Sequence, residues 1–168
     1  MRDRDATKQR LLKELYEYFG ADSKRIDHAK QVMNFAEELL RFEKADWIIV
    51  VPASILHDVG IKVAEEKYGS TADYYQEKEG PAVAERILSR SGFRREEIDE
   101  ICTIIANHHS PGKVNTVNFK VLYDADCLVN LKDKADNMDK ARLQETVNNM
   151  FLTEAGMRLA EKIYLNMP

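Results

Sequence analysis

The sequence is poor in the residues that interrupt regular structure, with seven glycines and four prolines among 168 residues. Barrels and sandwiches built of short strands need many more turn residues, so these folds are excluded. Few interruptions favour helices joined by short connections. The length fits one domain, and a hydrophobic content of 44% is enough for a sizeable core.

The chain also has little cysteine and no excess of basic charge. Its two cysteines, Cys102 and Cys127, cannot build a disulfide framework, which favours a reduced, cytoplasmic protein. A formal net charge of −4 argues against a partner that is a nucleic acid polymer. The longest apolar run, residues 47–56, is too short to cross a bilayer, and the amino terminus lacks the apolar core of a signal peptide. We therefore expect no membrane partner.

Hydrophobic residues recur at helical spacing and predict an all-α fold, a compact helical bundle formed by the whole chain. The clearest helix begins after Asp22 or Ser23, either of which can cap it, and runs to about Phe42. Residues 47–58 are apolar on nearly every face and predict a buried helix, with Pro52 in its first turns or at a kink. The other predicted helices cover residues 6–19, 61–68, 81–91, 96–107, 119–131, 139–149 and 153–166, and a polar loop precedes the helix at 81–91.

The four histidines lie at the edges of apolar helix faces or at helix ends. His28 borders the apolar stripe of the clearest helix, and His57 ends the buried helix. His108 and His109 together end a later helix. Any one of them alone is more often a hydrogen-bonded core residue or a surface residue than a ligand. Helical periodicity, however, turns all of these segments toward one core.

Two aspartates accompany these histidines. Asp58 follows His57 directly, so both side chains can reach one small volume. Asp126 lies between Leu122 and Val129 on the apolar face of its helix. An unpaired buried carboxylate is so unfavourable that it usually neutralises, pairs or binds a metal. Imidazole and carboxylate ligands without thiolate suit Mn, Fe, Co, Ni or Zn better than Ca, so the sequence predicts a divalent transition-metal site.

In chain order, these residues resemble the HD superfamily of metal-dependent phosphohydrolases. The matching motifs are His28, Leu56-His57-Asp58-Val59-Gly60, His108-His109 and Asp124-Ala125-Asp126-x-Leu128. The resemblance covers about residues 24–135, and it implies a single domain of the HD type on which the C-terminal helices, residues 139–166, pack. It also implies the primary metal ligands: His28, His57, Asp58 and Asp126.

Members of this family with two metals add a histidine after the His-Asp doublet and a His or His-His pair before the last aspartate. The pair is present as His108-His109, but Glu79 stands where the first histidine is expected. Because glutamate is itself a hard ligand, the resemblance allows a second metal held by Glu79, His108 and His109, with Asp58 bridging. The alternative is that Glu79 only favours the start of the helix at 81–91 through the helix dipole.

The resemblance implies a hydrolase that splits a small phosphate ester, nucleotide or polyphosphate with a water activated by the metal. Asp58 would orient or deprotonate this water, and His108 or His109 would protonate the leaving oxygen if it does not bind a second metal. Lys62, four residues after Asp58, would bind the phosphate, although a solvated lysine is an equal alternative. The sequence Ser110-Pro111-Gly112 replaces the Gly-Tyr-Pro signature of cyclic-di-nucleotide phosphodiesterases, so that substrate is not inferred.

Two other functions remain open at this point. The HD scaffold also carries di-iron oxygenases that use the same His/Asp cage, and it carries non-enzymatic modules that sense a ligand. A sensor would be marked by loss of a primary ligand, and all four are present. The sequence leaves open whether the chain forms a homo-oligomer, whether Asp124 supports the site or faces solvent, and whether residues 68–76 cover the site.

Overall fold

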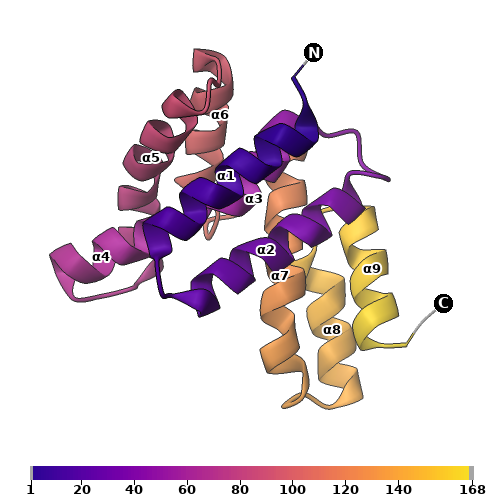
Figure 1. Ribbon diagram of the computed structural model, residues 1–168. Helices are drawn as coiled ribbons and strands as arrows, with labels where there is room; N and C mark the ends of the chain where they lie inside the picture. Colours follow the sequence, from indigo (N-terminus) through magenta and orange to yellow (C-terminus); the bar gives the residue numbers. More distant parts are fainter. Residues whose placement is uncertain (1, 167–168) are drawn as a thin grey trace.

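The computed structural model describes residues 2–166, which fold into nine α-helices and no strands (Figure 1). The prediction of an all-α fold is confirmed. The helices are α1 (Arg4–Phe19), α2 (Ser23–Leu39), α3 (Trp47–Leu56), α4 (Gly60–Tyr68), α5 (Asp73–Arg90), α6 (Arg95–Ile105), α7 (Val117–Ala135), α8 (Lys140–Met150) and α9 (Glu154–Tyr164).

Helix α3 forms the centre of the fold, in contact with α1, α2, α6 and α7. Every residue of α3 except Ile48 is buried, as its largely apolar sequence predicts. Pro52 lies inside the helix, at its sixth residue. By length and composition, Trp47–Tyr68 could cross a membrane, because α4 extends the apolar stretch beyond the run seen in the sequence. Since 72% of its 18-residue apolar window is buried inside the fold, this stretch forms part of the protein core.

Helix α2 packs on α3 and α7 and carries one metal-ligand candidate into the core. Asp22 caps it, as one of the two predicted alternatives, by accepting a hydrogen bond from the Arg25 backbone N–H at 3.2 Å. The helix ends at Leu39 rather than near Phe42. The N–H groups of both Phe42 and Glu43 bond to the Leu39 carbonyl, which closes a turn and redirects the chain toward α3.

The loop expected before the helix at 81–91 is largely absent, because α5 begins at Asp73 and contains Pro81 in its interior. Gly60 of α4 and Gly80 of α5 let the two helix backbones touch. A Cβ atom on Gly60 would lie 2.3 Å from the Gln76 carbonyl oxygen and 2.7 Å from the Gly80 nitrogen. This tertiary contact holds the first turns of α5 in helical form, even though Pro81 lacks the N–H for one bond of the ladder.

The contact between α4 and α5 leads to a first prediction. We expect Gly60→Ala to lower the free energy of unfolding by about 1–3 kcal/mol, since the added methyl group must push the α5 backbone away. Thermal unfolding followed by circular dichroism measures this change. Glu66→Ala, an exposed substitution on the same helix that breaks no ion pair among residues 2–166, serves as the control and should leave the midpoint unchanged. Equal midpoints for Gly60→Ala and the wild type would show that the two helices separate without cost.

The C-terminal helices are fastened to α7 by a buried carboxylate. Asp124 accepts hydrogen bonds from the Leu152 N–H at 2.8 Å and from the Thr153 N–H and hydroxyl at 2.8 and 2.6 Å. Thr153 caps α9, as its sequence predicts. Gly156 is needed here, because a Cβ atom would lie 2.2 Å from Asp124 Oδ2. Burial, together with the charge of Glu43, raises the pKa of Asp124 to about 6 despite its three donors. Asp124 therefore supports the fold and does not face solvent.

Candidate metal centre

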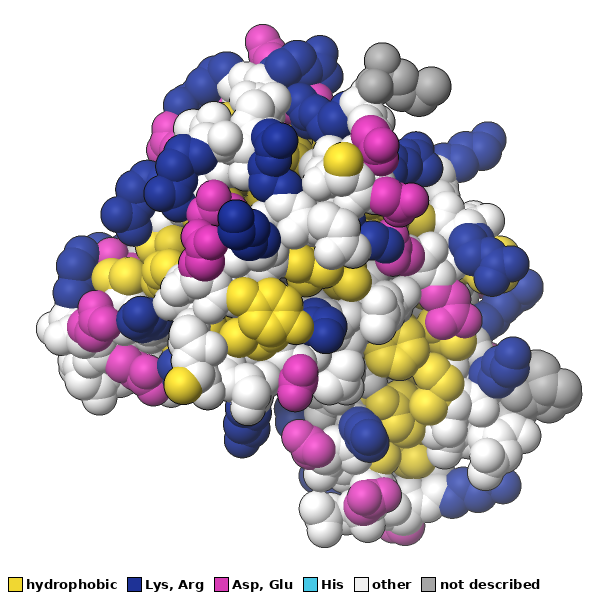
Figure 2. Space-filling view, in the orientation of Figure 1, with side chains coloured by type: hydrophobic (Ala, Val, Ile, Leu, Met, Phe, Trp, Pro, Cys, Tyr) yellow, Lys and Arg dark blue, Asp and Glu magenta, His cyan; other side chains and the backbone are white. Residues whose placement is uncertain are grey.

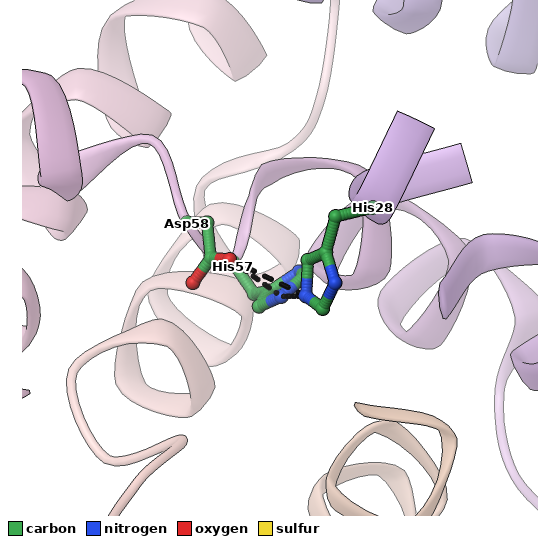
Figure 3. Close-up of side chains that lie close together, drawn as sticks. All are labelled: His28, His57 and Asp58. Carbon is green, nitrogen blue, oxygen red and sulfur yellow. Dashed lines mark hydrogen bonds and ion pairs between the residues drawn. The ribbon is translucent and has the colours of Figure 1, made fainter. Parts of the chain in front are cut away.

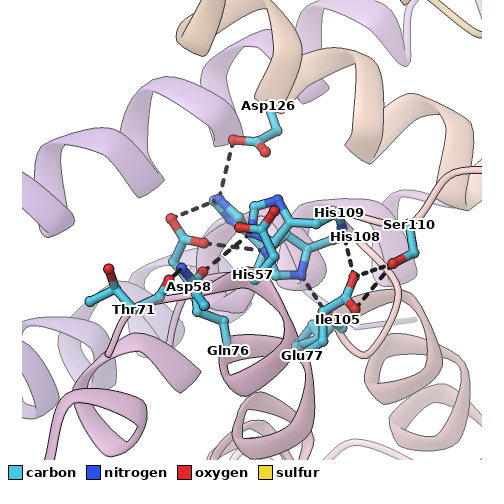
Figure 4. A network of polar contacts seen from close by, with 12 residues as sticks. His57, Asp58, Thr71, Gln76, Glu77, Ile105, His108, His109, Ser110 and Asp126 are labelled. Atoms are coloured by element: carbon cyan, nitrogen blue, oxygen red, sulfur yellow. Dashed lines mark hydrogen bonds and ion pairs between the residues drawn. The ribbon is translucent and has the colours of Figure 1, made fainter. Parts of the chain in front are cut away.

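Four side chains from three segments meet beside the end of α3 (Figures 3 and 4). Helix α2 supplies His28, the turn after α3 supplies His57 and Asp58, and α7 supplies Asp126. The Nε2 atom of His28 lies 3.1 Å from Asp126 Oδ1 and 3.4 Å from Asp58 Oδ2. The Nε2 atom of His57 lies 3.3 Å from His28 Nε2, 3.3 Å from Asp58 Oδ2 and 3.5 Å from Asp126 Oδ1. We call these four residues the primary cluster.

The buried histidines present lone pairs to the carboxylates. His57 donates its Nδ1–H to the Ser54 carbonyl at 2.7 Å, which leaves an electron pair on Nε2 in the neutral ring. His108 likewise donates Nδ1–H to the Ile105 carbonyl at 2.6 Å. Its Nε2 atom is buried and makes no hydrogen bond within residues 2–166. That atom lies 3.4 Å from Asp58 Oδ1, a second acceptor. Either a proton on an imidazole or a metal ion between these facing atoms would make the arrangement favourable.

The electrostatics of the primary cluster favour the same conclusion. Burial opposes a charge on His57, but the Asp58 and Asp126 carboxylates outweigh it and raise the pKa of His57 well above its usual value. Burial likewise opposes charge on both aspartates, yet the neighbouring histidines hold the pKa values of Asp58 and Asp126 below their usual range. The ionised carboxylates of Asp58 and Asp126 therefore both lie beside the Nε2 atom of His57. A proton on His57 offsets half of their charge, whereas a divalent metal ion in its place would balance both carboxylates.

The residues fit a bound transition metal. Separations of 3.1–3.5 Å between ligand atoms are those expected around an ion bound at about 2.0–2.2 Å. The Nδ1–H of His57 is fixed by a backbone carbonyl, which is the usual way in which a metal-binding histidine is oriented. The primary cluster would therefore hold one divalent ion.

A second group of ligand atoms adjoins the first and shares Asp58. Ligand atoms of Asp58, His108 and His109 lie within 4.8 Å of one another. Asp58 stands between the groups, with Oδ2 toward His28 and His57 and Oδ1 toward His108. Burial and the neighbouring His108 lower the pKa of His109. The structure thus brings the His108-His109 pair to the doublet, where the sequence places it.

Glu79 does not belong to this second group, which corrects the sequence-based expectation. Its carboxylate accepts hydrogen bonds from Lys67 Nζ at 2.8 Å and from the Tyr68 hydroxyl at 2.7 Å, on the side of α5 that faces α4. The reason is the earlier start of α5, which changes the face that each residue occupies. Gln76 faces the site instead, with Oε1 3.2 Å from His109 Nε2 (Figure 4). Asp73 Oδ1 lies 3.7 Å from the same nitrogen.

Asp73 and Gln76 entered the sequence analysis only as part of residues 68–76, the segment that could cover the site. Their spacing of three residues places both on one helix face, ahead of Gly80, but this signal is visible only when the helix is known to begin at Asp73. Glu77, one residue on, holds the histidine pair in place. Its carboxylate accepts hydrogen bonds from the His109 N–H and the Ser110 hydroxyl, both at 3.0 Å.

Lys62 also lies elsewhere than expected. Its Nζ atom donates to the Tyr18 carbonyl at 3.1 Å and sits over the Tyr18 ring, at the end of α1. The turn that carries the His-Asp doublet sets the phase of α4, and that phase directs Lys62 toward α1. Arg25, not Lys62, is the basic side chain whose charge interacts with the Asp58 carboxylate. Bonding to Glu65 raises the pKa of Arg25, and the Asp58 charge adds to this effect.

Arg25 lies three residues before His28, on the same face of α2, and the sequence analysis did not single it out. Its guanidinium forms two hydrogen bonds to Glu65, at 2.7 and 2.9 Å, and an ion pair with Asp22 at 3.2 Å. The spacing from His28 could have identified it, since residues three apart are neighbours on a helix surface.

Comparisons with known proteins agree with this geometry. Residues 25–131 match the family model described as HD domain. Among solved structures, the chain is similar to the crystal structure of a predicted HD superfamily hydrolase from an uncultured Thermotogales bacterium. The two share 24% sequence identity with a TM-score of 0.68, over 94% of this chain and 85% of the other. This likeness shows a common fold. No match was found among curated proteins.

Proposed function

Because the chain belongs to the HD-domain family, we propose that it is a metal-dependent phosphohydrolase acting on a small phosphate ester or nucleotide. One observation carries the proposal. The primary cluster (His28, His57, Asp58 and Asp126) brings two imidazoles and two ionised carboxylates to one point, beside a second group that shares Asp58. Such a shared carboxylate suits two ions that act together on one phosphate.

The bound metal would supply Lewis acidity, which polarises a phosphoryl oxygen and makes a water molecule a stronger acid. The residues of the chain do the remaining work. Asp58 stays ionised, because its pKa is held low, and it can orient the attacking water through the oxygen that faces His108. If His109 does not bind a second ion, it is the histidine of the pair that can exchange a proton with the leaving oxygen, since 23% of its side chain is exposed. Its lowered pKa makes the protonated form a stronger acid.

Arg25 supports a phosphate substrate. A guanidinium matches the geometry of a phosphate through two parallel hydrogen bonds. In this structure the guanidinium donates both hydrogen bonds to Glu65. The Glu65 side chain is 45% exposed and can move aside. A net charge of −4 and the absence of a basic groove from the sequence pattern favour a small substrate over a polymer. The two free cysteines agree with a cytoplasmic location.

We expect Arg25→Ala to raise KM about tenfold and to leave kcat within about twofold. This result follows if the guanidinium holds the phosphate equally in the ground state and the transition state. Steady-state rates of phosphate release at saturating metal measure both constants. Glu65→Gln is the matched control, because it breaks the ion pair and keeps the cation, so it should not raise KM. Lys62→Ala should change neither constant. A fall in kcat alone would assign Arg25 to the chemistry.

The proposed function is tested by phosphate release from a panel of nucleotides and sugar phosphates. Protein stripped with a chelator should be inactive, and activity should return with Mn, Mg, Co, Ni or Fe. No release with any of these ions would contradict the proposal. The shared position of Asp58 also suits a pair of irons, so a di-iron oxygenase is the second candidate. Oxygen consumption with iron, without phosphate release, would favour it.

A further inference from the structure

A groove separate from the metal centre lies between the end of α2 and α9. Its volume is about 430 Å³, and its apolar lining consists of Leu39, Phe42, Ala155 and Leu159. Leu39 is about 16 Å along α2 from His28, at the helical rise of about 1.5 Å per residue. Phe42 stands at the edge of the groove with 71% of its surface exposed, the most exposed large hydrophobic residue in the described part of the chain.

The wall formed by α9 is the uncovered half of an amphipathic helix. Gly156 and Ala160 are buried, and α9 packs on α7 and α8. Ala155, Leu159 and Ile163, spaced four residues apart, form a parallel stripe that the fold leaves partly open, with Ile163 41% exposed. Figure 2 shows apolar side chains between charged ones over the region of α8 and α9, at the lower right. Exposed apolar surface of this kind, rimmed by charge, is typical of an interface.

The charges along the groove are arranged so that the surface complements itself. The α2 side carries Glu38 and Glu43, and the α9 side carries Arg158 and Lys162. Arg158 pairs with Glu154 on its own helix, and Glu43 accepts the Ala155 N–H. Glu38 and Lys162, in contrast, take part in no ion pair among residues 2–166. A two-fold rotation brings the acidic side of one copy against the basic side of another.

We propose that this groove is the interface of a homodimer, with a second copy of the chain as its occupant. The protomers are related by a two-fold axis, and each Phe42 ring covers the apolar floor of the other protomer's groove. Glu38 of each protomer faces Lys162 of the other. A two-fold dimer uses the same surface of each protomer. One surface must therefore carry the projecting Phe42 ring, the apolar floor that receives it, and both acidic and basic side chains.

Charge reversal distinguishes a second copy from any other occupant. Wild-type protein should be dimeric in a dilution series followed by light scattering. Glu38→Lys and Lys162→Glu should each weaken the dimer at least about tenfold, because each puts two pairs of like charges in contact. When the two variants are mixed, the opposite charges match at both places, and a heterodimer should form with near wild-type affinity. Lys24→Glu, an exposed reversal near the start of α2, is the control and should not affect association.

Phe42→Glu tests the apolar part of the same interface. Because this side chain is mostly exposed within one chain, the variant should keep its helical circular dichroism spectrum and its metal content and become monomeric. A wild-type monomer throughout the dilution series would overturn the proposal. A dimer that survives Phe42→Glu and both charge reversals would also overturn it, since another face would then join the protomers.

Discussion

Asp58→Asn is expected to reduce kcat for phosphate release by about 10³-fold or more at saturating metal. Asp58 has one oxygen toward His28 and His57 and the other toward His108, so both groups of ligand atoms depend on it. The substitution removes the negative charge with almost no change in volume. Initial rates measured beside the circular dichroism spectrum separate a loss of chemistry from a loss of fold.

Glu79→Gln is the matched control for this result. It removes the charge of a carboxylate that was expected from the sequence to bind a metal. In the structure this carboxylate accepts hydrogen bonds from Lys67 and Tyr68 instead. Its metal content and kcat should stay at the wild-type level, with a small loss of stability. A kcat for Asp58→Asn within tenfold of the wild type would contradict the assigned role of Asp58.

His108→Ala should produce the second largest effect, a fall from near two metal ions per chain toward one. The buried Nε2 atom of His108 has no hydrogen-bond partner within the described residues and faces the Asp58 carboxylate, so a second cation would use it. Loss of that cation should lower kcat by on the order of 10²-fold, while the primary cluster keeps its ion. Metal titration followed by mass spectrometry gives the stoichiometry.

The outcome for the wild type decides between the two roles of the histidine pair. A ratio that stays at one ion per chain under saturating metal would exclude the second site. His108 and His109 would then face the substrate as proton donors. In that case His108→Ala should lower kcat and leave the metal content unchanged.

Local sequence signals predict most of the helices, because they depend on neighbours in the chain. Asp22 and Thr153 cap α2 and α9, and the apolar sequence of α3 places it in the core. The first turns of α5 could not be predicted in this way. They contain no apolar periodicity, and the contact between Gly60 and Gly80 that holds them joins residues of two helices. Tertiary packing there outweighs the local pattern.

The candidate site was predicted to the extent that it depends on motifs. His28, His57, Asp58 and Asp126 meet in the structure, as the resemblance implied, and His108 and His109 join Asp58. Glu79 and Lys62 were misplaced because one residue of helical phase turns a side chain by about 100°. Arg25 was missed, and Asp73 and Gln76 were placed only in a segment that could cover the site, for a related reason: their relevance depends on which helix faces meet.

The ions bound per chain, measured by mass spectrometry after metal loading and dialysis, test the metal centre most directly. The wild type is compared with a double variant, His57→Ala with Asp126→Asn, that retains the helical circular dichroism spectrum. We predict at least one tightly bound transition-metal ion per wild-type chain and the loss of one ion in the double variant. Equal metal content in the two proteins would contradict the assignment of the primary cluster as a metal site.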